Sequence, residues 1–190
     1  NNSINNLNSN KLYHNIETLI LYNIGIYSEE CLKLLGDILT NPFCGIKSLV
    51  LSQNNLGSIP SVNNIDVKNL NDTKYFLECL QKNKSVTELI LLNCQIGNEV
   101  TEEIYNMLNY NRSIEYLVLY NNNINNQETF LKLLSLFSDF GDKNKVVNCS
   151  MRVLDLSKNN CSIDINNRFL NIIEGLQLIS LDISQNALSR

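Results

Sequence analysis

The chain has 190 residues, of which 44% are hydrophobic, and this is enough for one domain with its own core. Its 15 Lys and Arg residues are outnumbered by 19 Asp and Glu, so nucleic acid is not expected as a partner. No apolar run reaches the roughly 18 residues of a membrane span, and residues 1–10 lack the regions of a signal peptide. The sequence therefore predicts a cytoplasmic protein without membrane insertion.

The chain begins with a polar stretch of low complexity, residues 1–15, which predicts a disordered tail or a poor N-terminal cap. From residue 16 onward a pattern of 11 residues recurs, with apolar residues at its first, fourth, sixth and eleventh places. The ninth place is Asn or Cys in every copy except the first, which has Ile24. We call these copies the repeat segments, and they are residues 16–26, 46–56, 86–96, 114–124, 151–161 and 178–188.

Each repeat segment predicts a short β-strand followed by a turn, because strand side chains alternate between two faces. After the first, third and fourth segments, apolar residues recur at helical spacing, so strands and helices are expected to alternate. Asn98 is expected to cap the helix that follows the third segment. The expected core residues of these helices are Leu32, Leu35, Leu39, Val100, Ile104, Met107, Leu108, Phe130, Leu133, Leu134 and Phe137.

The pattern L-x-x-L-x-L-x-x-N/C-x-L, repeated over residues 16–190, resembles the leucine-rich-repeat family. The room for a full helix in each repeat is similar to the ribonuclease-inhibitor-like subclass. The resemblance implies an α/β fold, a curved solenoid of about six repeats with a parallel β-sheet on its concave face and helices on its convex face. One repeat cannot bury its apolar side alone, so a last segment that ends beside Arg190 predicts a part of a longer solenoid.

Asparagine is expected to serve the backbone at two places in the repeat. At the ninth place its carboxamide can satisfy backbone groups of neighbouring turns, and Cys94 can do this only in part. Asn83 and Asn111 precede a strand by the same interval, which favours a role where a helix ends over glycosylation. Five N-x-S/T sequons occur in all, at Asn1, Asn71, Asn83, Asn111 and Asn148.

Two spacings between repeat segments exceed the others by about ten residues. The excess lies at residues 57–72 and 139–150, which are rich in turn-forming residues, and we interpret both as enlarged loops. They are either tolerated insertions or contact loops for a partner.

The residues that carry chemistry do not form a recognisable catalytic pattern. The single histidine, His14, precedes the first repeat segment, which disfavours a catalytic triad or a histidine metal site. No glycine-rich phosphate-binding motif occurs, and the six cysteines show no C-x-x-C spacing and are expected to be buried thiols. We therefore expect no enzyme activity, no cofactor, no metal and no small-molecule substrate.

The informative surface is the face of the sheet formed by the third, fifth and seventh places of the repeat segments, which should point away from the buried places. In the first four segments the fifth place is aliphatic, and tyrosines stand nearby; an exposed apolar patch of this kind is typical of a protein-binding surface. The alternative is that β-branched residues merely suit strands. The candidate partner-binding residues are Ile20, Tyr22, Val50, Ile90, Leu92, Tyr116, Val118, Tyr120, Asp155 and Asp182.

The sequence thus predicts a protein-interaction or scaffold module that holds another protein on its concave face. The resemblance also allows a GTPase regulator similar to the Ran GTPase-activating proteins, which an acidic tail would favour. An extracellular receptor of the same repeat class would be expected to carry cysteine-rich caps, and we find none in the sequence.

Overall fold

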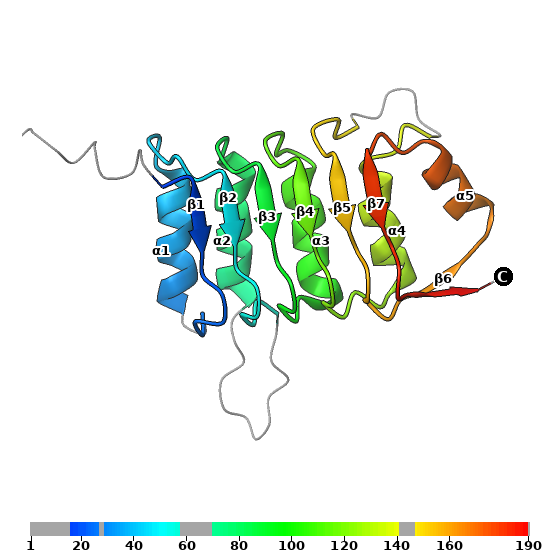
Figure 1. Cartoon of the computed structure of the whole chain (residues 1–190), viewed down its shortest axis with the longest axis horizontal. Coiled ribbons are helices and arrows are strands. Elements are labelled where there is room, and N and C mark those ends of the chain that lie inside the picture. Colours follow the sequence, from blue (N-terminus) through cyan, green and yellow to red (C-terminus); the bar gives the residue numbers. More distant parts are fainter. Residues whose placement is uncertain (1–15, 27–28, 58–69, 141–146, 190) are drawn as a thin grey trace, which may run out of the picture.

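The computed structural model describes residues 16–26, 29–57, 70–140 and 147–189, so the predicted tail at 1–15 lies outside the described residues. Its centre is a six-stranded parallel sheet in which each strand pairs with the strand of the next repeat segment, in the order β1-β2-β3-β4-β5-β7 (Figure 1). The strands are β1 (Thr18–Ile20), β2 (Ser48–Val50), β3 (Glu88–Ile90), β4 (Tyr116–Val118), β5 (Val153–Asp155) and β7 (Ser180–Asp182).

Helices stand behind this sheet in one layer, and a helix connects each strand to the next (Figure 1). Parallel neighbours require such a crossover, because the chain must return to the starting edge before the next strand. The protein is therefore an α/β fold, and each predicted strand is found within its repeat segment. The helices are α1 (Glu29–Thr40), α2 (Leu70–Lys82), α3 (Gly97–Leu108), α4 (Gln127–Ser135) and α5 (Asn167–Glu174).

The core lies between the sheet and the helices. The central residue of each inner strand, such as Leu89, is fully buried, and so is the sixth-place residue that follows the strand, such as Leu91. All eleven residues predicted to face the core from helices are buried, although Phe137 lies two residues after the end of α4. Alternation in the strands and helical spacing in the connections thus direct their apolar side chains into one shared layer.

The turn after each strand has a residue in the left-handed backbone region at the eighth place of the repeat segment. At this place φ lies between 49° at Asn23 and 59° at Gln53. Asparagine tolerates this conformation better than most side chains, which explains part of the high asparagine content. The remaining left-handed residues at this place are Asn93, Asn121, Lys158 and Gln185.

The ninth-place asparagines tie neighbouring turns together as the sequence predicts. The Asn159 carboxamide oxygen accepts the backbone N–H groups of Asn122 and Ile124, at 2.8 and 3.2 Å. Its amide nitrogen donates to the carbonyls of Leu119 and Leu156, at 3.0 and 2.9 Å. Cys94 fills the same place, and its thiol donates to the carbonyls of Leu51 and Leu92, at 3.3 and 3.4 Å. A thiol has no carboxamide oxygen to accept the N–H groups of the turn before it, so it replaces the asparagine only in part.

Asparagine also closes the ends of the helices. The Asn111 amide donates to the Leu80 carbonyl of the preceding helix at 2.8 Å, and its oxygen accepts the backbone N–H groups of Ser113 and Ile114. Asn83 and Asn148 do the same towards Leu39 and Leu108. All three asparagines are buried, so the predicted structural role of Asn83 and Asn111 is confirmed and extends to Asn148.

Two details differ from the sequence prediction. Asn98 does not cap α3, because Gly97 turns the chain with a φ of +67° and the helix already begins there. The Asn98 carboxamide instead joins Asn125 and the N–H of Asn126 in the next turn. A second parallel pair, β6 (Ser162–Asp164) with β8 (Ala187–Ser189), extends the last two repeat segments.

The predicted loop enlargements are described only at their margins. Residues 70–72 of the first belong to the first turn of α2, whereas residues 58–69 lie outside the described residues. In the second, residues 139, 140 and 147–150 are described, and Asn148 belongs to the buried helix-end network.

Among the helices of the described ranges, none is long and apolar enough to cross a membrane.

Candidate functional site

The face of the six-stranded sheet that is turned away from the helices is the main candidate surface, and we call it the open face. Within the part of the chain that the structure describes, no helix lies over it (Figure 1). It consists of the third, fifth and seventh places of the repeat segments. The strand register aligns these places into rows that run across the sheet.

The fifth-place row has two chemical halves. Ile20 pairs in register with Val50, and the row continues through Ile90 and Val118. Asp155 and then Asp182 complete it on β5 and β7. Neighbouring parallel strands are about 4.8 Å apart, so the aliphatic half spans roughly 15 Å before the two carboxylates follow.

All ten residues that the sequence nominated for partner binding are at least partly exposed. Ile20 and Tyr22 are 62% and 52% exposed, and Tyr116 is 41% exposed. Asp182 is also exposed. The other candidates lie on inner strands, where side chains of the neighbouring strands flank them on both sides. These half-buried candidates are Val50, Ile90, Leu92, Val118, Tyr120 and Asp155.

The seventh place departs from the sequence prediction in two segments. Ser52 and Ser157 are buried rather than outward-facing. The Ser52 hydroxyl accepts the backbone N–H of Leu92 at 3.3 Å, and the Ser157 hydroxyl donates to Asp155 at 2.5 Å. A short polar side chain can turn back to a nearby polar group, which a tyrosine at the same place cannot do.

The two aspartates of the fifth row are held by the serines two residues after them. Oδ1 of Asp155 accepts both the N–H and the hydroxyl of Ser157, at 2.8 and 2.5 Å. Oδ1 of Asp182 accepts the N–H of Ser184 at 2.8 Å. Hydrogen bonds from Ser184 lower the pKa of Asp182, so this carboxylate is charged at neutral pH.

Glu88 is an acidic residue of the open face that the sequence analysis did not include among the candidate site residues. It lies in the third-place row, between Ser48 and Tyr116, and the Ser48 hydroxyl donates to its carboxylate. Its place in the repeat was the signal that could have identified it. The aromatic members of the face also have a charged neighbour, since the Lys158 amine lies 5.4 Å from the centre of the Tyr120 ring.

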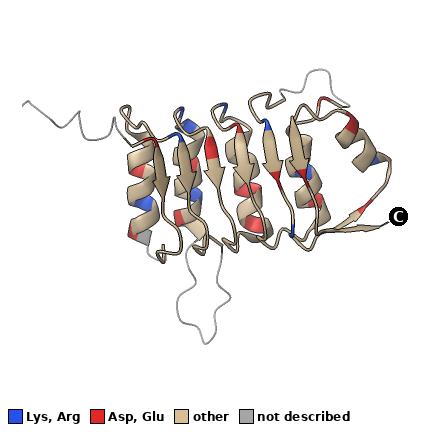
Figure 2. Ribbon diagram, viewed as in Figure 1, with Lys and Arg blue, Asp and Glu red and all other residues tan. Residues whose placement is uncertain are grey.

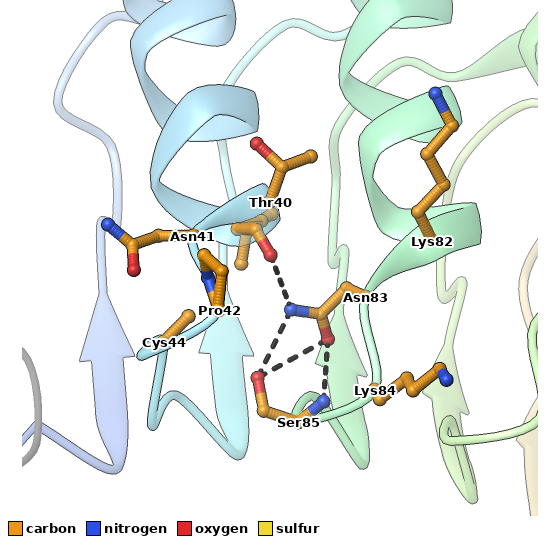
Figure 3. Close-up of a pocket in the computed structure, with 9 residues that line it drawn as sticks. Thr40, Asn41, Pro42, Cys44, Lys82, Asn83, Lys84 and Ser85 are labelled. Carbon is orange, nitrogen blue, oxygen red and sulfur yellow. Dashed lines mark hydrogen bonds between the residues drawn. The ribbon is translucent and has the colours of Figure 1, made fainter.

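Apart from the open face, a pocket lies where α1 and α2 end and the chain enters β2 and β3 (Figure 3). It is lined by Thr40, Pro42 and Cys44 from one repeat and by Lys82, Asn83, Lys84 and Ser85 from the next. The Asn83 carboxamide inside it is already bonded to the Leu39 carbonyl and to Ser85. Its central polar group is therefore engaged in holding the two helix ends.

The cysteines and acids do not gather into one site in the described ranges, where no group of three His, Cys, Asp or Glu residues is placed to hold a metal ion. Each of the six cysteines is a thiol, but Cys31 and Cys149 are exposed, which corrects the expectation that all would be buried. Both lie outside the apolar layer: the side chain of Cys31 is on the outer side of α1, and Cys149 follows the buried Asn148.

Other charged residues join neighbouring repeats at the helix surface and at the sheet edge. Glu103 pairs with Lys74 of α2, and Glu102 pairs with Lys132 of α4. At the edge where the strands begin, Lys47 pairs with Glu17, and Arg152 pairs with Glu115 at 2.9 Å. Figure 2 shows these charges spread over several repeats.

No family model matches this chain, and no curated protein sequence matches it.

Proposed function

We propose that the chain is a leucine-rich-repeat solenoid of the ribonuclease-inhibitor-like subclass and that it binds another protein through its open face. The repeat proposal is supported by units of strand, left-handed turn and helix that share the same buried places. It is also supported by the two series of asparagine bonds, each of which joins one unit to the next. Stacked units of this kind form extended binding surfaces.

The observation that carries the binding proposal is the aliphatic half of the fifth-place row, from Ile20 to Val118, over which no helix or strand of the described residues lies. β-branched residues suit strands on either face, but four of them side by side on neighbouring strands also form a contiguous apolar patch of the kind that marks protein-binding surfaces. Tyr22, Tyr116 and Tyr120 border this row. Tyrosine offers a large contact area together with a hydroxyl for a hydrogen bond, and it is enriched in protein interfaces.

The proposal can be tested by placing a photo-activatable amino acid at position 118 and isolating the cross-linked protein from the native cell extract. A variant with Ile90→Asp and Tyr120→Glu should lose the cross-linked partner by at least about tenfold, because charge would be buried without a counter-charge. Far-ultraviolet circular dichroism should stay unchanged.

The matched control is Leu34→Asp on the outer side of α1, where Leu34 is 61% exposed. This variant should retain the partner. If instead Leu34→Asp removes the partner and the open-face variant keeps it, the proposed surface is wrong and the helix side binds.

We propose a cytoplasmic location as well. It is supported by six cysteines that are all thiols and by three sequons, at Asn83, Asn111 and Asn148, whose side-chain amides are buried and bonded. The proposed scaffold role needs no cofactor, metal or small-molecule substrate. A GTPase regulator stays the alternative, and faster GTP hydrolysis by a Ran-type GTPase in the presence of this chain would favour it.

A further inference from the structure

We infer that the partner of the open face is a basic polypeptide segment that places apolar side chains against the row from Ile20 to Val118 and Lys or Arg against Asp155 and Asp182. This inference rests on the proposed function and specifies the chemistry of the partner and its orientation. It follows from how charge is distributed over the three rows of the open face.

The rows contain acids and no bases. Across the third, fifth and seventh places of the six repeat segments, the charged residues are Glu88, Asp155 and Asp182, and no Lys, Arg or His occurs. Of the cations next to these rows in sequence, Lys47 pairs with Glu17 and Arg152 pairs with Glu115. Lys158 lies over Tyr120 and keeps its charge, so it offsets only one of the three acids. A partner that covers this face therefore meets unbalanced negative charge at one end of an apolar strip.

The two aspartates are adjacent in register, on strands about 4.8 Å apart. Within the described ranges, no cation pairs with either of them. Among the described residues, both bonds that Asp155 accepts go to its Oδ1, and the residue is partly exposed, so we place the ligand at its Oδ2. Two like charges this close repel each other, and a guanidinium or ammonium group between them would relieve that repulsion.

The order of residues in the row determines which end of the partner lies over which strands. Covering the aliphatic half removes water from the carboxylates beside it, and a carboxylate that loses water without a counter-charge destabilises the complex. An apolar segment alone is therefore disfavoured, and so is one that carries acids. A segment satisfies both halves of the row when its apolar residues lie over β1 to β4 and its basic residues lie over β5 and β7.

The probe is a random-peptide phage library selected against the intact chain, followed by affinity measurement of the enriched peptides by fluorescence anisotropy. Enriched peptides should combine aliphatic or aromatic residues with Lys or Arg. The double variant Asp155→Asn, Asp182→Asn should weaken their binding by about tenfold, and higher salt should reduce the difference between the variant and the unchanged chain. Asparagine preserves the oxygen that accepts the serine N–H, so the fold should persist.

The matched control removes the same charge elsewhere. Glu30 on α1 and Glu99 on α3 are exposed on the helix side, and the double variant Glu30→Gln, Glu99→Gln should change the affinity by less than about twofold. If both double variants weaken binding equally, the peptides respond only to net charge and the inference is wrong.

The remaining outcomes separate the inference from the proposed function. Peptides that lose affinity with Ile90→Asp but not with Asp155→Asn, Asp182→Asn would refute the inference of a basic partner. This result would support the open face as the binding surface. If no enriched peptide depends on Ile90, the proposed function itself is refuted.

Discussion

The inner repeat segments bury the first residue of the pattern, with at most 6% exposed at Ile46, whereas Ile16 at the same place in the first segment is 51% exposed. The eleventh place shows the same contrast at the other end. Ile124 and Cys161 are fully buried there, but Leu188 of the last segment is 52% exposed. Identical places in the pattern thus have different environments, because burial comes from the neighbouring unit and not from the segment itself.

The test of this contrast with the largest expected effect on the free energy of unfolding is to remove the same side chain from an inner strand and from an end strand. Leu117→Ala in β4 deletes a fully buried side chain and should lower the free energy of unfolding by about 4 kcal/mol. Leu181→Ala in β7, at the same place in a half-buried site, should cost about 2 kcal/mol. Equal losses in urea denaturation would show that the end unit is as tightly packed as the inner ones.

A second test uses the ninth-place asparagine. Asn159→Ala would leave buried backbone N–H and carbonyl groups on both sides without partners, and should cost about 3 kcal/mol. Asn186→Ala removes the corresponding bonds in the last segment, where the site is half-buried and water can replace them, so about 1 kcal/mol is expected. The comparison is made by thermal or urea unfolding, and a greater loss for Asn186→Ala would contradict it.

The smallest effect is expected at the one inner turn that lacks the asparagine. Cys94→Asn should restore a carboxamide between the turns of the second and third segments and raise the free energy of unfolding by about 1 kcal/mol. The control is Cys94→Ser, which fits the site but gains no second polar atom and should not stabilise. If Cys94→Asn destabilises the chain, this turn has adapted to the smaller thiol.

The sequence predicted the sheet because the pattern of each repeat segment is strict at its buried places. Leu89 and Leu117, for example, could only be central strand residues once the alternation was recognised, and their pairing follows from the shared register. The predicted start of α3 was wrong by two residues, because Asn98 was taken as the N-cap whereas the helix begins at Gly97, whose φ is +67°.

The candidate site was predictable in position but not in detail. Alternation placed Ile20 and Asp182 on the open face, as the structure does. It could not reveal that Ser157 turns inward to Asp155, because that choice depends on the rotamer of a short side chain. The pair of β6 and β8 was also missed, since β6 comes after its repeat segment and β8 begins at the tenth place of the last one, where no strand was expected.

The left-handed residue in each turn limits what one unit can do by itself. For a side chain other than glycine this conformation costs about 1 kcal/mol, and it occurs at Asn121 and Lys158 as well as at the other turns. The bonds that hold the Asn122 turn come from Asn159 in the next one. An excised segment would therefore relax into another shape, and its eleven residues specify a turn only when a neighbour is already in place.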